Sequence, residues 1–199
     1  MKFHHTNKKH QRARKGFTLI ELLVVIAILA TLAAVSFGPI MKFLGSGDLT
    51  VDVKTAKDLQ SAISAYEDKY KYLPYDGSTP TEDTAYDTEA GEGMEIIRIL
   101  MGDNSSGANP SSKPFFEPQQ AKDGRNGMIY DNDNPQSLMD SFGRPFKFVI
   151  AYGDDQYVDV SEISSDYGDP TELKIIESSA VAGGGPDQEF NDEEDAKSW

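Results

Sequence analysis

The feature that most constrains this chain is an apolar run close to its N-terminus. Phe17–Phe37 contains 21 residues, of which the polar ones are Thr18, Glu21, Thr31 and Ser36. As a helix with a rise of about 1.5 Å per residue, the run would be roughly 32 Å long, and the hydrocarbon core of a bilayer is about 30 Å thick. The run therefore predicts a membrane-spanning helix.

The charge on either side of this run predicts its orientation. All six charged residues of Met1–Gly16 are basic, which leaves 13 basic against 33 acidic residues in the rest of the chain, a formal charge of −20. Because positive flanks favour the cytoplasmic side, we expect the N-terminus inside and the body outside the cytoplasm. A body this acidic repels nucleic acid and favours solubility, divalent cations or basic partners.

The composition excludes several kinds of chemistry. The chain has no cysteine, so it forms no disulfide, thiolate metal site or cysteine nucleophile. Its three histidines, His4, His5 and His10, all precede the apolar run. The body therefore has no histidine base for a serine triad and no histidine metal ligand, and we expect no enzymatic activity.

Three interpretations of the N-terminal run compete. A secretory signal peptide has a shorter apolar stretch of about 7–15 residues, although Ala34-Val35-Ser36 would be a weak cleavage site. A plain signal anchor fits the length, but neither interpretation explains Gly16 before the run or Glu21 inside it. Insertion of a carboxylate into the membrane core costs about 2.5–3.5 kcal/mol. Glu21 would avoid this cost if it lay in the headgroup region or were stabilised by the helix dipole. After a cut behind Gly16, the free amine of Phe17 on a neighbouring helix would neutralise that carboxylate.

The junction Lys15-Gly16-Phe17-Thr18-Leu19-Ile20-Glu21 resembles the class III leader of type IV pilins and type II secretion pseudopilins. The resemblance implies that a prepilin peptidase cuts between Gly16 and Phe17 and methylates the new amine of Phe17. It also implies that Glu21 assists assembly through the N-terminus of a neighbouring subunit.

A second, amphipathic helix pattern follows the apolar run. Apolar residues recur at spacings of three or four, at Val53, Ala56, Leu59, Ile63, Tyr66 and Tyr70. This face predicts packing against a sheet, with a loosened turn at Gly45-Ser46-Gly47 and an end near Tyr72-Leu73-Pro74. The resemblance to pilins implies that one long helix, half transmembrane and half packed on a small antiparallel sheet, forms an α+β, pilin-like fold.

The rest of the chain is assigned by residue type. We expect four segments: 1–16 as a basic leader, 17–73 as transmembrane and stalk helix, 74–127 as a loop-rich variable region, and 128–199 as antiparallel sheet and acidic C-terminal loop. Met94–Leu100 reads as a short helix within the variable region. β-Branched and aromatic residues predict strands at Phe146–Tyr152, Tyr157–Val160 and Leu173–Glu177, the first two joined by a turn at Gly153–Gln156.

Two later stretches resemble the major pseudopilin of type II secretion. Asp140–Phe146 is similar to its aspartate, aromatic-glycine and proline-aromatic segment, and Gly184–Trp199 is similar to its C-terminal loop. In that family the loop binds calcium, so the resemblance implies a Ca²⁺ site. Its ligands would be the carboxylates of Asp187, Glu194 and Asp195 with a carbonyl near Gly184.

These expectations combine into a structural role. The resemblance implies a subunit of a type II secretion pseudopilus that spans the inner membrane once, with its C-terminal domain in the periplasm. Its partners would be further copies of itself, the prepilin peptidase, minor pseudopilins and the inner-membrane assembly platform, and not nucleic acid. A type IV pilin, a minor pilin, or a membrane-anchored acidic binding protein are the alternatives.

Overall fold

The computed structural model describes residues 19–75, 80–89, 91–153, 158–167, 178–186, 189–190 and 195–199, with the backbone alone described at 33–46 and 166. The chain divides into two compact units, Met1–Phe43 and Leu44–Trp199. The predicted strand Leu173–Glu177 and most of the predicted turn Gly153–Gln156 lie outside the described residues.

The long N-terminal helix, α1, extends over Leu19–Tyr70. Its helical assignment continues through Gly45-Ser46-Gly47, so the predicted loosening is not observed. The helix ends at Tyr70, slightly before the predicted Tyr72-Leu73-Pro74. Lys71 follows with a φ of 66°, and its amide donates to the Glu67 carbonyl at 2.6 Å. A left-handed residue at this place ends the helical repeat.

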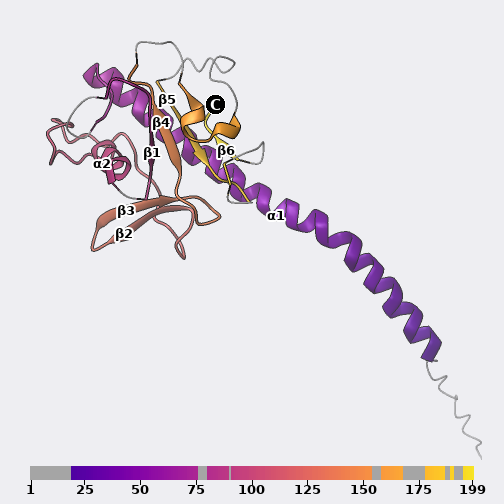
Figure 1. Cartoon of the computed structure of the whole chain (residues 1–199). Coiled ribbons are helices and arrows are strands. Elements are labelled where there is room, and N and C mark those ends of the chain that lie inside the picture. The colour runs from indigo at the N-terminus through magenta and orange to yellow at the C-terminus, as the bar shows by residue number, and fades with distance from the viewer. Residues whose placement is uncertain are drawn as a thin grey trace, which may run out of the picture. The chain divides into compact units, whose positions relative to one another are not determined.

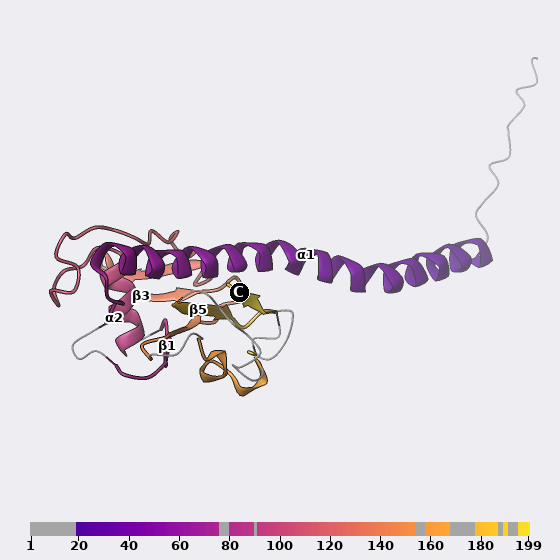
Figure 2. The same ribbon diagram turned by 90° about the horizontal axis from the view of Figure 1, so that it is seen from above.

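In the unit Leu44–Trp199, α1 packs through the apolar face that the sequence predicts. Ala56, Leu59, Ile63 and Tyr66 are fully buried, and Val53 and Tyr70 are partly buried. Figures 1 and 2 show this part of α1 lying along the sheet. The α+β architecture with a helix packed on an antiparallel sheet is therefore confirmed.

The main sheet has four antiparallel strands in the order β1-β4-β5-β6. Their bounds are Thr84–Asp87, Lys147–Ile150, Ser179–Gly183 and Ala196–Lys197. Successive residues of a strand point to opposite faces, and here both faces are covered. Phe148, Ile150 and Val181 join the core under α1, whereas Val149 and Ala180 join a second cluster with Val158, Val160 and Ile163.

The predicted strands agree with this sheet only in part. β4 confirms the strand expected within Phe146–Tyr152, although it is shorter. Tyr157 lies outside the described residues, and the strand expected at Tyr157–Val160 is wrong for the rest: Val158 and Asp159 are in no strand, and Val160 begins a 3₁₀ turn, η1, which extends over Val160–Glu162. Asp159 caps this turn by accepting a hydrogen bond from the Ser161 amide at 2.9 Å. A side chain that satisfies the backbone locally competes with strand pairing.

The variable region is more ordered than its composition suggests. The short helix is confirmed as α2, Gly91–Leu100, but β1 was not predicted, because its TAYD sequence has little apolar pattern. Asn109 fastens the loop after α2. Its side-chain amide donates to the Ile99 and Lys113 carbonyls, both at 2.8 Å, and its Oδ1 accepts from the Tyr70 hydroxyl at 2.6 Å.

A separate hairpin extends from the main sheet. β2, Gly127–Asp131, pairs with β3, Asn134–Met139, and Asn132 and Asp133 between them have φ values of 49° and 65°. A two-residue turn of this kind needs two positive φ angles. The buried Thr88 joins the hairpin to β4, since its hydroxyl lies 2.7 Å from the Leu138 carbonyl and 3.0 Å from that of Phe146.

At the contact between α2 and β1, Gly93 leaves no room for a larger side chain. A Cβ on Gly93 would lie 2.1 Å from the Asp87 carbonyl oxygen, which is backbone and cannot move aside. We expect Gly93→Ala to lower the free energy of unfolding by about 1–3 kcal/mol, because steric strain outweighs the gain in helix propensity. Gly47→Ala, with open space around the added methyl, should instead raise stability by up to about 1 kcal/mol. Denaturant unfolding of both variants tests this, and equal stabilities would contradict it.

Candidate functional site

The first candidate site is the N-terminal part of α1. Gly16 and Phe17, the expected cleavage and methylation positions, lie outside the described residues. Glu21 is exposed in the first turn of α1, where the helix dipole favours a carboxylate. The structure thus places Glu21 at the start of a helix, as the sequence predicts.

The segment Leu19–Leu32 of α1 presents an apolar surface. Every residue in it is exposed, and its large aliphatic side chains are between 45% (Val25) and 84% (Leu19) accessible. A continuous apolar surface of this size is a mark of association with a protein or a membrane. In the parts of the chain that are described, no helix is both long enough and apolar enough to cross a membrane.

The second candidate site is the C-terminal loop. Asp187 and Glu194 lie outside the described residues, but Gly184 and Asp195 are described and buried. β5 and β6 pair antiparallel with Gly183 opposite Ala196, so the next residues, Gly184 and Asp195, come to the same end of the ladder. Two of the four predicted calcium ligands are therefore brought together. No set of three histidine, cysteine or acidic residues fit to hold a metal occurs among the residues with described positions.

The described part of the acidic tail is packed against the body. Asp195, 4% exposed, accepts a hydrogen bond from the Tyr167 hydroxyl at 2.9 Å. The Tyr167 ring meets Trp199 edge-on at 5.5 Å between centroids, and Lys197 Nζ lies 4.8 Å from the centre of the same ring. The Val181 amide donates to Ser198 Oγ at 3.0 Å. These contacts hold the end of the chain against β5.

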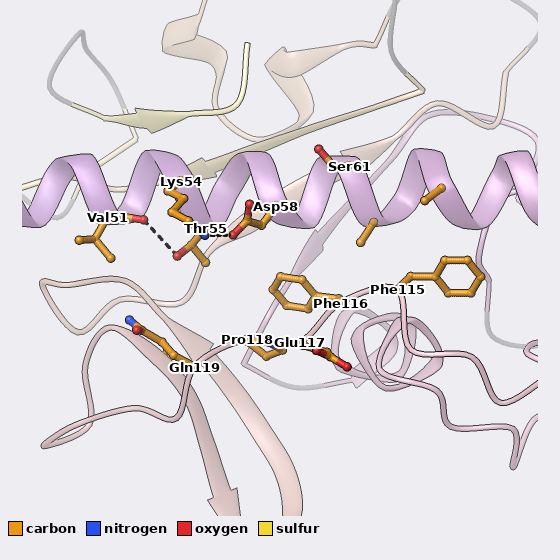
Figure 3. Close-up of a pocket in the computed structure, with 13 residues that line it drawn as sticks. Val51, Lys54, Thr55, Asp58, Ser61, Phe115, Phe116, Glu117, Pro118 and Gln119 are labelled. Atoms are coloured by element: carbon orange, nitrogen blue, oxygen red, sulfur yellow. Dashed lines mark hydrogen bonds and ion pairs between the residues drawn. The ribbon is translucent and has the colours of Figure 1, made fainter.

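A groove of about 710 Å³ lies between α1 and the segment Phe115–Gln119 (Figure 3). Some of its polar side chains make contacts within α1: Thr55 donates to the Val51 carbonyl at 3.1 Å, and Lys54 forms an ion pair with Asp58. The residues that line it include no histidine or cysteine.

The sequence interpretation missed one polar contact between α1 and the loop after β3. Asp52 is 1% exposed, and its Oδ1 accepts hydrogen bonds from the Ser141 amide at 2.9 Å and the Ser141 hydroxyl at 2.8 Å. Burial raises the pKa of Asp52 to about 7, against the lowering effect of these hydrogen bonds. The helical spacing of the sequence indicates that Asp52 is buried, because it precedes Ala56 by four residues and Leu59 by seven and so shares their buried face.

Comparison with known proteins bears on the leader. Residues 11–37 match the prokaryotic N-terminal methylation motif, a stretch that includes Gly16, Phe17 and Glu21. No curated protein and no solved structure matches the chain significantly. The motif fits a type IV pilin-like substrate of a prepilin peptidase and indicates a structural subunit rather than an enzyme. The match at residues 11–37 thus supports the type IV pilin-like family for this chain.

Proposed function

We propose that the chain is a structural subunit of a type II secretion pseudopilus, which polymerises through its N-terminal helix to drive protein export. The observation that carries the proposal is the exposed apolar surface Leu19–Leu32, which lies within the matched methylation motif. An apolar helix surface of this kind favours packing against equivalent helices of further copies. The chain itself performs no reaction.

Processing and membrane insertion come first in this proposal. The basic leader and the run Phe17–Phe37 support a single pass through the inner membrane, with the unit Leu44–Trp199 in the periplasm. A prepilin peptidase removes residues 1–16 and methylates Phe17. Minor pseudopilins and the inner-membrane assembly platform are the further partners.

The choice of a secretion pseudopilus over a surface pilus rests on two resemblances. Asp140–Phe146 and the C-terminal loop are similar to the major pseudopilin of type II secretion. In this structure the first forms the loop that contacts Asp52, and the described end of the second packs on β5. A type IV pilin or minor pilin would share the leader and the helix without requiring either segment.

The C-terminal loop is proposed to bind Ca²⁺ through Asp187, Glu194, Asp195 and the carbonyl of Gly184. The pairing of β5 with β6, which brings Gly184 and Asp195 together, supports this ligand set. A calcium ion takes six to eight oxygen ligands, so water would complete the shell. Bound calcium would fasten the acidic loop to the sheet.

The leader predicts the start of the mature protein. We expect intact-mass and N-terminal sequence analysis of chain isolated from cells with an active prepilin peptidase to show a start at N-methyl-Phe17. A start near Ser36 or Phe37 would instead indicate ordinary secretion and would overturn the proposed assembly. Unprocessed chain from cells that lack the peptidase is the control.

The proposed role of Glu21 predicts that its loss impairs fibre assembly but not membrane insertion. We expect Glu21→Ala to reach the membrane at the wild-type level but to reduce fibre formation at least tenfold, because the Phe17 amine of the neighbour loses its counter-charge. Sheared fibres and membrane fractions are measured by immunoblot. Glu92→Ala, which removes an exposed acid from the first turn of α2, should assemble normally. Wild-type fibre yield from Glu21→Ala would remove the proposed role.

The calcium site predicts saturable binding that depends on the loop. Isothermal titration of the full chain with CaCl₂ should give a binding isotherm that Asp187→Ala abolishes, since a carboxylate ligand is lost. Asp68→Asn removes an equally negative but exposed residue on α1 and should bind like the wild type. The proposed site would be wrong if the wild type bound no calcium or if Asp187→Ala bound it equally.

A further inference from the structure

Two buried carboxyl groups at the contact between α1 and the loop after β3 have no role in the function proposed above. Asp52 uses Oδ1 for its two hydrogen bonds from Ser141, while its Oδ2 is buried without a hydrogen-bond partner among the described residues. The Ser141 hydroxyl also lies 3.3 Å from the Asp48 carbonyl, one turn earlier on α1. Ser141 thus fastens the loop to two successive turns of the helix.

Asp140 repeats the arrangement inside the loop. It is fully buried, and its Oδ1 accepts from the Phe142 amide at 2.9 Å and the Arg144 amide at 2.8 Å. These bonds hold a tight turn in which Gly143 has a φ of 87°. Its Oδ2, like that of Asp52, is buried without a hydrogen-bond partner within the described part of the chain. Each carboxyl therefore holds the loop with one oxygen and leaves the other unsatisfied.

An ionised carboxylate in such a position is costly, because its second oxygen is buried and meets no donor from the described residues. The charges of Asp140 and Asp48 add to burial in raising the pKa of Asp52. The pKa of Asp140 is also raised, chiefly by burial, although Arg144 and the loop amides act against this shift. Arg125 is a further charged residue at the loop, since its side chain lies beside Gly143.

We propose that Asp52 is a proton-dependent latch that fastens the loop Asp140–Arg144 to α1. With a proton on Asp52, the pair of carboxyls carries at most one charge and the Ser141 contacts hold. When Asp52 ionises, a second buried negative charge forms close to Asp140 and the loop separates from the helix. The inference depends on the geometry of the unit Leu44–Trp199 alone, and not on what the chain assembles into.

A divalent cation would also satisfy the two unpartnered oxygens, but the structure favours the proton. Two carboxylate oxygens fall far short of the six to eight ligands that calcium requires. The described residues also contain no group of three or more potential metal-binding side chains. A proton needs only one acceptor oxygen, and Asp52 offers it.

The direction of the pH response follows from the two states. The pKa of Asp52 is about 7 in the closed contact and close to the ordinary value of about 4 once the loop has opened. Opening therefore releases a proton between about pH 4 and pH 7. The equilibrium constant for opening should rise up to about tenfold per pH unit in that window and level off above it.

Hydrogen exchange of the full chain measures this opening at the loop itself. After correction for the intrinsic pH dependence of exchange, the peptide that contains the Ser141 amide should lose protection between pH 5 and pH 7, by up to about tenfold per unit. Asp52→Asn keeps an acceptor oxygen for Ser141 but cannot ionise, so its protection should not vary with pH. Asp58→Asn, on the same helix but half exposed, should retain the wild-type response.

Two further variants test the latch even if Asp52→Asn fails to fold. Ser141→Ala removes the hydroxyl donor, which favours the ionised form, and keeps the backbone amide, so the midpoint of the transition should move to higher pH. Asp140→Asn removes a neighbouring charge and should move the midpoint to lower pH. The latch is refuted if the pH response survives in Asp52→Asn, or if neither variant moves the midpoint. Restoration of protection at pH 8 by millimolar Ca²⁺ or Mg²⁺ would replace it with a cation site.

Discussion

The body of this protein depends on the burial of one face of α1 against the sheet. The strands contain between two and five residues in the main sheet, and the chain has no cysteine to form a disulfide. A sheet of such short strands needs a second layer, and Leu59, Ile63 and Tyr66 supply it. Each fully buried side chain of this size contributes about 1.5–3 kcal/mol, so a few helix positions provide much of the stability.

Other features of the body attach to this helix through its polar groups. The Tyr66 hydroxyl donates to the Ala108 carbonyl at 2.6 Å, and the Tyr70 hydroxyl lies at the same distance from Asn109 Oδ1, so the variable region is held along the helix. Gln60 donates to the Ser179 carbonyl at 2.7 Å at the start of β5. Asp52 holds the loop after β3. One helix face therefore orders segments that are far apart in the sequence.

The N-terminal part of the same helix has its apolar side chains exposed instead of buried. Apart from Glu21 and Thr31, its side chains between Leu19 and Leu32 are apolar, and all of them are exposed, whereas those between Ala56 and Tyr66 include both buried and exposed positions. A surface of the first kind is stable in water only when a partner covers it. The matched methylation motif overlaps that surface, which is why a role in assembly accounts for both features.

The sequence by itself determined the leader, the long helix, its buried face, α2 and β4, because each is a local pattern of residue type and period. It could not determine that β1 pairs beside β4, that β5 follows β4 in the sheet, or that Val160 begins a 3₁₀ turn. Those outcomes depend on contacts distant in sequence and on the capping side chain of Asp159. Helical spacing places Asp52 on the buried face of α1, but only the tertiary structure decided which groups it meets there, since Ser141 and Asp140 are about ninety residues away in the sequence.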